Sequence, residues 1–403
     1  MALPRNIRLL LGYSFFSMFL VIIPVIVPYY LSLGLTMSQV FQVQAVFAFS
    51  VAVLEVPTGY LSDIWSRRKT LLVGALLLGI GFSVLPFCRN FSHLVVFEIV
   101  VACAHSFISG TDVALLYDSL GDASNDRRTT KNALANLQFS AVTAESIASL
   151  LSGVLVMISF SKVLLAQAIG AWMPFVFALF IVEPVVTRMD TSTHLENFKR
   201  ILKHIFVSDR TLRLIFLNLT VFGLSTFFAV WILQKYWQDA GIPLAWFGAI
   251  WALFNFSVGI IGKLTHRLEE KLGPVPLLLV IAITPALAYF TMGWRFSLLG
   301  VASGILFYIS RGFCQVLLND AFNWRVPTEF RATANSLSSL VFRLSFAISA
   351  PLVGYCVDRY GLLAALRGLG GAVVVAIIFL MLPLIRDISK KAPEGIPYPP
   401  NSK

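Results

Sequence analysis

Charged residues are scarce in this chain. Asp, Glu, Lys and Arg make up 13% of its 403 residues, whereas a soluble domain carries about 25%. The composition therefore excludes an ordinary water-soluble fold. Cysteine is scarce too: the four copies, Cys88, Cys103, Cys314 and Cys356, form no CxxC pair and no Cys/His metal spacing. We expect four free thiols that pack as small apolar side chains, and no metal site.

Short catalytic motifs are also absent. The sequence contains no HExxH, no GxSxG and no Walker motif. His105 is the only histidine expected deep within a hydrophobic segment. These absences argue against a membrane enzyme, against a bound cofactor, and against an ATP-driven pump contained within this chain.

Long hydrophobic runs dominate what is present. The chain is 58% hydrophobic, its mean hydropathy is +0.82, and a membrane-spanning helix needs about 20 mostly apolar residues. We predict an all-α polytopic membrane protein that lies in a lipid bilayer. Its twelve predicted spans are residues 8–32, 38–62, 70–88, 93–119, 132–158, 163–187, 212–237, 244–265, 275–294, 296–323, 333–357 and 362–385.

The net charge of +11 has two interpretations, nucleic-acid binding or the positive-inside bias of membrane proteins. With the N-terminus in the cytoplasm, about 23 of the 31 Lys and Arg residues fall in or beside cytoplasmic loops. The opposite orientation would invert that bias. We therefore predict an inner (plasma) membrane protein with both termini in the cytoplasm and no nucleic-acid partner.

The two halves of the chain resemble each other. Leu115-Leu116-Tyr117-Asp118 ends the fourth span, and Leu317-Leu318-Asn319-Asp320 ends the tenth, about 200 residues later. Two six-helix halves related by an axis along the membrane normal would leave this pattern. We predict one bundle at residues 1–187, a cytoplasmic loop at 188–211, a second bundle at 212–391 and a disordered, proline-rich tail at 392–403.

A short acidic-then-basic turn follows the second span. It reads Gly59-Tyr60-Leu61-Ser62-Asp63-Ile64-Trp65-Ser66-Arg67-Arg68-Lys69. This turn resembles the loop between helices 2 and 3 of the major facilitator superfamily of secondary transporters, whose pattern is G-x-L-[GSA]-D-R-x-G-R-[RK]-[RK]. Ile64 and Ser66 depart from the pattern at the usual Arg and Gly. A second copy after the eighth span, at residues 262–267, has no counterpart of Asp63.

The resemblance implies a fold of two pseudo-symmetric six-helix bundles that rock about a central substrate site, and a protein that works as a monomer. It also implies a gating motif of Gly59, Asp63, Arg67, Arg68 and Asp118. In that motif Asp63 contacts the start of helix 11, and Arg67 reaches Asp118 at the end of helix 4. Arg267 and Asp320 are expected to echo these contacts in the second half.

Ionisable residues inside a span are costly and indicate function. Glu98, His105 and Asp112 are spaced by seven, so they would share one face of a continuous fourth helix. Family members use this helix to line the central cavity. The stripe is interpreted either as a proton relay or as a set of structural hydrogen bonds, with Glu98 solvated near the outer surface.

Further candidates lie on other spans. Glu145 on helix 5 is a candidate proton site. Arg311 on helix 10 should face the cavity, where it either pairs with Asp112 or binds an anionic substrate group. Glu55 and Arg343 lie at similar depths on helices 2 and 11, which face each other in the family. Their predicted pair is either a gate that breaks on rocking or a permanent tie.

The leading functional prediction is a secondary active transporter of a small organic solute, namely proton-coupled efflux of an amphipathic compound by an antiporter. Protons are favoured over sodium because acids and a histidine lie within the spans. The alternative is an uptake symporter or facilitator for a metabolite such as a sugar or an organic anion. A non-transporting membrane receptor or scaffold is the alternative from another class.

Overall fold

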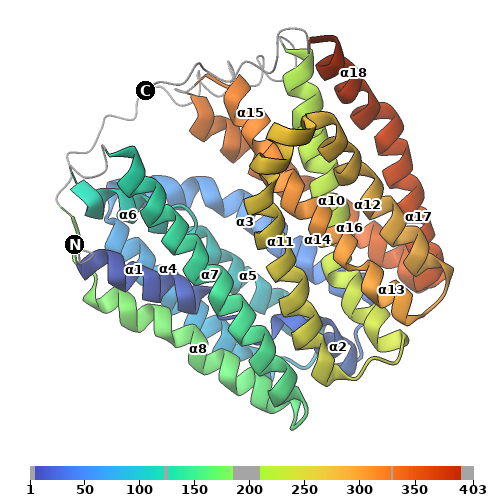
Figure 1. The fold of residues 1–403 in the computed structure, drawn as a ribbon. Helices are drawn as coiled ribbons and strands as arrows, with labels where there is room; N and C mark the ends of the chain where they lie inside the picture. The colour runs from blue at the N-terminus through green and yellow to red at the C-terminus, as the bar shows by residue number, and fades with distance from the viewer. Residues whose placement is uncertain (1–4, 122–125, 185–208, 328–329, 392–403) are drawn as a thin grey trace. The chain divides into compact units, whose positions relative to one another are not determined.

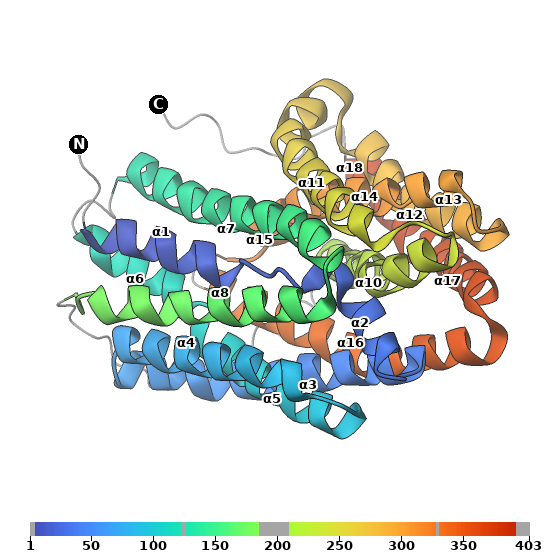
Figure 2. The ribbon, with the colours of Figure 1, turned by 90° about the horizontal axis from the view of Figure 1, so that it is seen from below.

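A computed structural model describes residues 5–121, 126–184, 209–327 and 330–391, and all regular structure in these ranges is helical. The chain forms two compact units (Figures 1 and 2). Unit 1 comprises Met1–Asp190, Trp237–Phe256 and Arg343–Asp358, and unit 2 comprises Thr191–Tyr236, Ser257–Phe342 and Arg359–Lys403. The predicted loop at 188–208 and tail at 392–403 lie outside the described residues.

The helices divide between the units as follows. Unit 1 contains α1 (Arg5–Ser17), α2 (Ile26–Ser32), α3 (Met37–Ile64), α4 (Arg67–Val84), α5 (Phe91–Ile108), α6 (Thr111–Leu120), α7 (Arg127–Val156) and α8 (Phe160–Phe180), with the start of α11 (Leu244–Leu272) and most of the second half of α16 (Arg331–Tyr360). Unit 2 contains most of α10 (Arg210–Asp239) and the remaining parts of α11 and α16. It also contains α12 (Pro274–Trp294), α13 (Leu298–Ser303), α14 (Ile305–Phe313), α15 (Asn319–Arg325), α17 (Leu362–Ala376) and α18 (Leu382–Lys391).

Eleven helical segments of the described chain are long and apolar enough to cross a membrane. The predicted first span, 8–32, is broken into α1, a 3-10 turn at Ile23–Val25 and α2. Pro24 lies in that turn. Proline lacks a backbone N–H and disfavours helical geometry at the residue before it. Pro24 therefore explains why the helix is interrupted between α1 and α2.

The fourth predicted span is also two helices, α5 and α6, joined at Ser109 and Gly110. Gly110 has φ of 78°, a left-handed conformation that glycine adopts readily. The predicted single stripe is therefore wrong beyond Ile108. Glu98 and His105 share α5, whereas Asp112 belongs to the first turn of a new helix.

The tenth predicted span shows a comparable irregularity. It comprises α13, α14, a π-helical turn at Cys314–Leu318, and α15. At the repeat offset of about 200 residues, Arg311 and Gly312 correspond to Ser109 and Gly110. The π-helical turn begins two residues after the position equivalent to Gly110. The predicted repeat itself stays a prediction.

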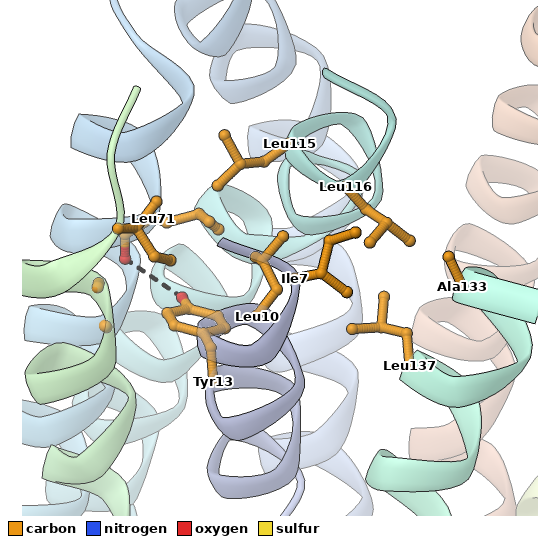
Figure 3. Packing of buried hydrophobic residues seen from close by; sticks show 11 residues of the cluster. Ile7, Leu10, Tyr13, Leu71, Leu115, Leu116, Ala133 and Leu137 are labelled. Atoms are coloured by element: carbon orange, nitrogen blue, oxygen red, sulfur yellow. Dashed lines mark hydrogen bonds between the residues drawn. The ribbon is translucent and has the colours of Figure 1, made fainter. Parts of the chain in front are cut away.

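Packing within unit 1 is centred on α1 and α4. α1 contacts α7 and α8, and α4 contacts α5 and α8. Buried side chains from five helices and the residue following α8 form one cluster (Figure 3): Ile7, Leu10, Tyr13, Leu71, Ala75, Leu115, Leu116, Ala133, Leu137, Ala178 and Ile181. The hydroxyl of Tyr13 donates to the carbonyl of Leu71 at 3.2 Å, which satisfies the one polar group of a fully buried ring.

Two sets of contacts tie α11 and α16 into unit 1. A β-carbon at Gly248 of α11 would overlap the carbonyl oxygen of Ser149 on α7, so only glycine permits this approach. The carboxylate of Asp358, near the end of α16, accepts from the backbone N–H groups of Met37 and Ser38 at 3.0 and 2.7 Å. Asp358 therefore caps the N-terminus of α3, where a negative charge is favoured.

Candidate functional site

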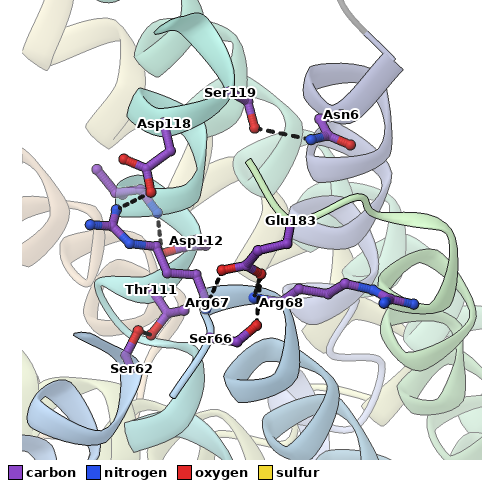
Figure 4. Close-up of polar contacts among 11 residues, drawn as sticks. Asn6, Ser62, Ser66, Arg67, Arg68, Thr111, Asp112, Asp118, Ser119 and Glu183 are labelled. Atoms are coloured by element: carbon purple, nitrogen blue, oxygen red, sulfur yellow. Dashed lines mark hydrogen bonds and ion pairs between the residues drawn. The ribbon is translucent and has the colours of Figure 1, made fainter. Parts of the chain in front are cut away.

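The acidic-then-basic turn joins α3 to α4 and contacts α6. Nη1 of Arg67 lies 3.0 Å from Oδ2 of Asp118, and the two side chains are 24% and 14% exposed (Figure 4). This is the contact that the family resemblance implies for these residues, while their gating role stays a prediction. Gly59 lies within the last two turns of α3. The side chain of Asp63 lies outside the described residues, so its contact with helix 11 stays a prediction as well.

Glu183 holds the start of α4 and was missed by sequence reasoning. Its carboxylate accepts from the hydroxyl of Ser66 at 2.7 Å and from the backbone N–H groups of Arg67 and Arg68 at 3.1 and 2.8 Å (Figure 4). The guanidinium of Arg68 donates to the carbonyl of Leu179 at 3.0 Å, close to the end of α8. The available signal was an acid near the end of the predicted span 163–187, together with a basic helix start that has no acid in its first turn.

Glu55 and Arg343 form an ion pair within unit 1. Nε of Arg343 lies 3.7 Å from Oε2 of Glu55, and the hydroxyl of Ser109 donates to Oε1 of Glu55 at 3.4 Å. Ser109 is the residue at which α5 ends. One turn earlier, the ring of His105 packs edge-on to Phe47. The pair therefore joins α3, α16 and the break in the fourth span.

Glu98 is buried, with 5% of its surface exposed. Its Oε1 accepts from the hydroxyl of Tyr30 at 3.1 Å and from the side-chain amide of Gln44 at 2.8 Å. Among the described residues no cation pairs with this carboxyl group. The interpretation of Glu98 as a solvated surface acid is therefore wrong, because α2 and α3 cover it.

Glu145 of α7 accepts two hydrogen bonds from α11. The indole N–H of Trp251 donates to Oε1 at 3.2 Å, and the amide of Asn255 donates to the same oxygen at 2.8 Å. These bonds lie on the same pair of helices as the close approach of Ser149 and Gly248. Glu145 thus takes part in the α7–α11 contact, and its predicted proton role stays untested.

Asp112 lies in the first turn of α6, beside the acidic-then-basic turn (Figure 4). Its Oδ1 accepts from the backbone N–H of Val113 at 2.8 Å, and the hydroxyl of Thr111 donates to that of Ser62 at 3.2 Å. Asp112 belongs to unit 1 and Arg311 to unit 2. Their predicted pairing stays a prediction.

The second-half echo takes a different form in unit 2. Oδ2 of Asp320 lies 3.6 Å from Nε2 of His266, and both side chains are exposed. Arg267, the predicted residue, is the exposed neighbour of this histidine. Exposed pairs of this kind contribute about 0–1 kcal/mol, so the contact between His266 and Asp320 is weak.

Unit 2 contains a cavity of about 390 Å³. Its lining comes from α10, from α14 through α15, and from α16: Leu219, Thr220, Gly223, Thr226, Phe227, Arg311, Cys314, Gln315, Asn319, Ser338, Ser339 and Phe342. Arg311, a predicted site residue, is the one charged member of this lining. Among the described residues no group of three or more His, Cys, Asp or Glu side chains could hold a metal ion.

Comparisons with known proteins identify the architecture. A family model described as Major Facilitator Superfamily matches residues 9–350. No curated protein matches the chain in sequence. The nucleoside transporter NupG has a similar structure, with a TM-score of 0.76 at 12% identity, covering 94% of this chain and 98% of that one.

Two other solved structures are similar over nearly their whole length. A POT family transporter in complex with a thioalcohol-conjugated peptide gives a TM-score of 0.76 at 16% identity, covering 96% of both chains. A bacterial homolog of the human lysosomal transporter Spinster, inward-facing and unoccupied, gives 0.70 at 15% identity and covers 98% of both. At these identities the likeness shows the fold alone.

Proposed function

The chain belongs to the Major Facilitator Superfamily and is a secondary transporter, and from that premise we propose that it exports a small amphipathic organic solute in exchange for protons. It is a non-enzymatic, all-helical membrane protein. The proposal adds the coupling ion, the direction and the solute class. It also places both termini in the cytoplasm, the protein in the inner membrane and the working unit as a monomer.

The observation that best supports proton coupling is the burial of Glu98. An ionised carboxylate away from water is costly unless a cation or several donors compensate it. Glu98 has two neutral donors, Tyr30 and Gln44, and no cationic partner among the described residues. A carboxyl group in this environment is suited to bind a proton and to release it when its surroundings become wet.

Alternating access would require the bundles at 1–187 and 212–391 to rock. We propose that the contact between Glu55 and Arg343, which come from different bundles, forms and breaks during that movement. Arg67 and Asp118 both lie in the bundle 1–187, so we propose that their contact holds the acidic-then-basic turn in place while the bundles move. Glu55 and Arg343 are part-exposed in the described structure, so water can replace part of what each loses when the pair opens. Glu98 connects to the same elements, because Gln44 and Glu55 both lie on α3.

Reconstituted vesicles with an internal pH dye test the coupling. We compare wild type with Glu98→Gln and Asp112→Asn while candidate solutes are added. Glu98→Gln keeps an acceptor oxygen for Tyr30 and Gln44 but cannot carry a proton, so solute-driven proton movement should disappear. Glu270→Gln is the matched control, because Glu270 is exposed on α11. Full proton movement in Glu98→Gln contradicts the proposed role of Glu98.

Uptake of a polar metabolite is the second candidate. The unit 2 cavity favours it through a set of hydroxyl and amide side chains on its wall: Thr220, Thr226, Gln315, Asn319, Ser338 and Ser339. The sign of the pH change separates the candidates. When solute is loaded inside vesicles and leaves, exchange brings protons in and acidifies the lumen, whereas symport carries protons out and makes it alkaline.

A further inference from the structure

The unit 2 cavity has the size of a small-molecule site. Its volume of about 390 Å³ falls within the roughly 300–1,000 Å³ of known ligand pockets. Three separate stretches of chain converge on it, at residues 219–227, 311–319 and 338–342. A site built from several helices of one unit can hold a ligand in a defined orientation.

Arg311 supplies a positive charge with unused donors. A guanidinium has five N–H donors and no acceptor, and here Nη2 donates to the carbonyl of Thr226 at 2.9 Å. The guanidinium carbon also lies 5.1 Å from the centre of the Tyr308 ring. Within the described part of unit 2 no carboxylate pairs with Arg311. The hydrogen bond to Thr226 and the contact with the Tyr308 ring hold the Arg311 guanidinium in place. Its remaining N–H donors can bind a ligand.

The backbone next to Arg311 is specialised. The π-helical turn at Cys314–Leu318 begins three residues later, and π-helical turns within helices occur frequently at functional sites. Cys314 and Gln315 of this turn line the cavity, as does Asn319 directly after it. The extra residue in the turn shifts the phase of the helix, so the side chains on either side of it can face the same cavity.

One part of the cavity wall is aromatic. The rings of Phe227 and Phe342 meet edge to face, with centres 5.6 Å apart. Both residues line the cavity together with Arg311 and the hydroxyl-bearing Ser338 and Ser339. A ligand that fits these surfaces carries a planar apolar group at one end and a planar anion at the other.

We propose that Arg311 binds the carboxylate of an aryl-substituted organic acid, whose apolar part packs on Phe227 and Phe342. This inference rests on the proposed function and names the substrate class of that transporter. A carboxylate matches the guanidinium fork, because two parallel N–H donors meet its two oxygens. An inorganic anion would satisfy the charge but leave the aromatic wall and most of the cavity unfilled.

Binding to the purified full-length protein tests this inference directly. The probes are phenylacetate, 3-phenylpropionate and indole-3-acetate, each paired with its neutral primary amide, and inorganic sulfate. We expect at least one acid to bind wild type about tenfold or more tightly than its amide, because a hydrogen bond to a charged partner is stronger than a neutral one. Equal affinities of acid and amide, binding of sulfate alone, or no binding by any of the acids overturns the inference.

Three variants locate the bound carboxylate. Arg311→Gln should weaken binding of the acid by about tenfold or more and leave binding of the amide unchanged. Arg311→Lys should weaken binding of the acid several-fold, since Lys keeps the charge but lacks the planar pair of N–H donors. Arg295→Gln removes the same charge from an exposed position after α12 and should bind like wild type. If Arg311→Gln does not fold, the affinity of Arg311→Lys for the acid and the difference in wild-type affinity between acid and amide decide whether Arg311 binds the carboxylate. Wild-type affinity in both Arg311 variants overturns the assignment.

The binding test and the vesicle test fail separately. If an acid binds through Arg311 but drives no Glu98-dependent proton movement, the carboxylate site is supported and the proposed proton coupling is contradicted. If a neutral solute drives such proton movement and none of the acids binds, the proton coupling is supported and the carboxylate site is contradicted.

Discussion

Arg343 and Glu55 form an ion pair between α16 and α3, with 3.7 Å between Nε and Oε2. The two side chains are 21% and 32% exposed, so water screens the pair only in part. Ser109 adds a hydrogen bond from the end of α5. The ion pair and this hydrogen bond therefore link α3, the end of α5 and α16.

Neutralising one member of this pair should be worse than neutralising both. Glu55→Gln or Arg343→Gln removes one charge of this ion pair and leaves the opposite charge in place, and we expect each to destabilise the protein by about 1–3 kcal/mol. The double variant should recover part of that loss. Thermal unfolding in detergent measures it, and strictly additive losses would show that the two charges do not interact.

Glu183 should be needed for the start of α4. Glu183→Ala removes three hydrogen bonds at a helix N-terminus, and we expect a loss of about 1–2 kcal/mol, as for a helix cap. Glu270→Ala, which removes an exposed acid, should change stability by less than about 0.5 kcal/mol. Melting temperatures of the two variants provide the comparison, and equal shifts would contradict the capping role.

Gly248→Ala should disrupt the contact between α7 and α11, because the added methyl group would overlap the carbonyl of Ser149. We expect a loss of about 1–3 kcal/mol from forced separation. Gly259→Ala on the same helix is the matched control, since a β-carbon there meets nothing within 4 Å. The control should be neutral or stabilising by about 0.4–1 kcal/mol. Similar unfolding temperatures for both variants would mean that α7 and α11 tolerate wider spacing.

Tyr30 and Glu98 should be energetically coupled. In a double-mutant cycle, Tyr30→Phe and Glu98→Gln should give an interaction energy of about 0.5 kcal/mol or more, because the two groups share a buried hydrogen bond. Tyr13→Phe removes an equally buried hydroxyl that donates to Leu71 instead, so its effect should add to that of Glu98→Gln. Additivity in the Tyr30 cycle would show that the bond contributes little.

Composition and the hydrophobic runs predicted the architecture well, because a bilayer permits few structures and these runs mark the membrane-spanning helices directly. The breaks within spans were harder to predict. Ser109 and Gly110 lie in an apolar segment that reads as continuous helix, and glycine occurs in many unbroken membrane helices. Gly110 adopts a positive φ, which glycine tolerates but does not require.

Some contacts of the candidate site could be predicted from the sequence and others could not. Arg67 and Asp118 could be paired from the sequence because a family pattern specifies both positions. Glu183 and Asp358 cap helices that start more than 100 residues away in the chain, and no local spacing indicates such partners. Glu98 was predicted as a candidate, but its burial depends on α2, whose position follows from the break at Pro24.

The capping of α3 by Asp358 has a consequence for biogenesis. Thr36 satisfies the N–H of Gln39 locally, whereas the acceptor for Ser38 is synthesised 320 residues later. At roughly 5–20 residues per second, translation needs about 15–60 s to supply it. The N–H groups of Met37 and Ser38 therefore acquire this acceptor only after Asp358 has been synthesised, long after α3 itself.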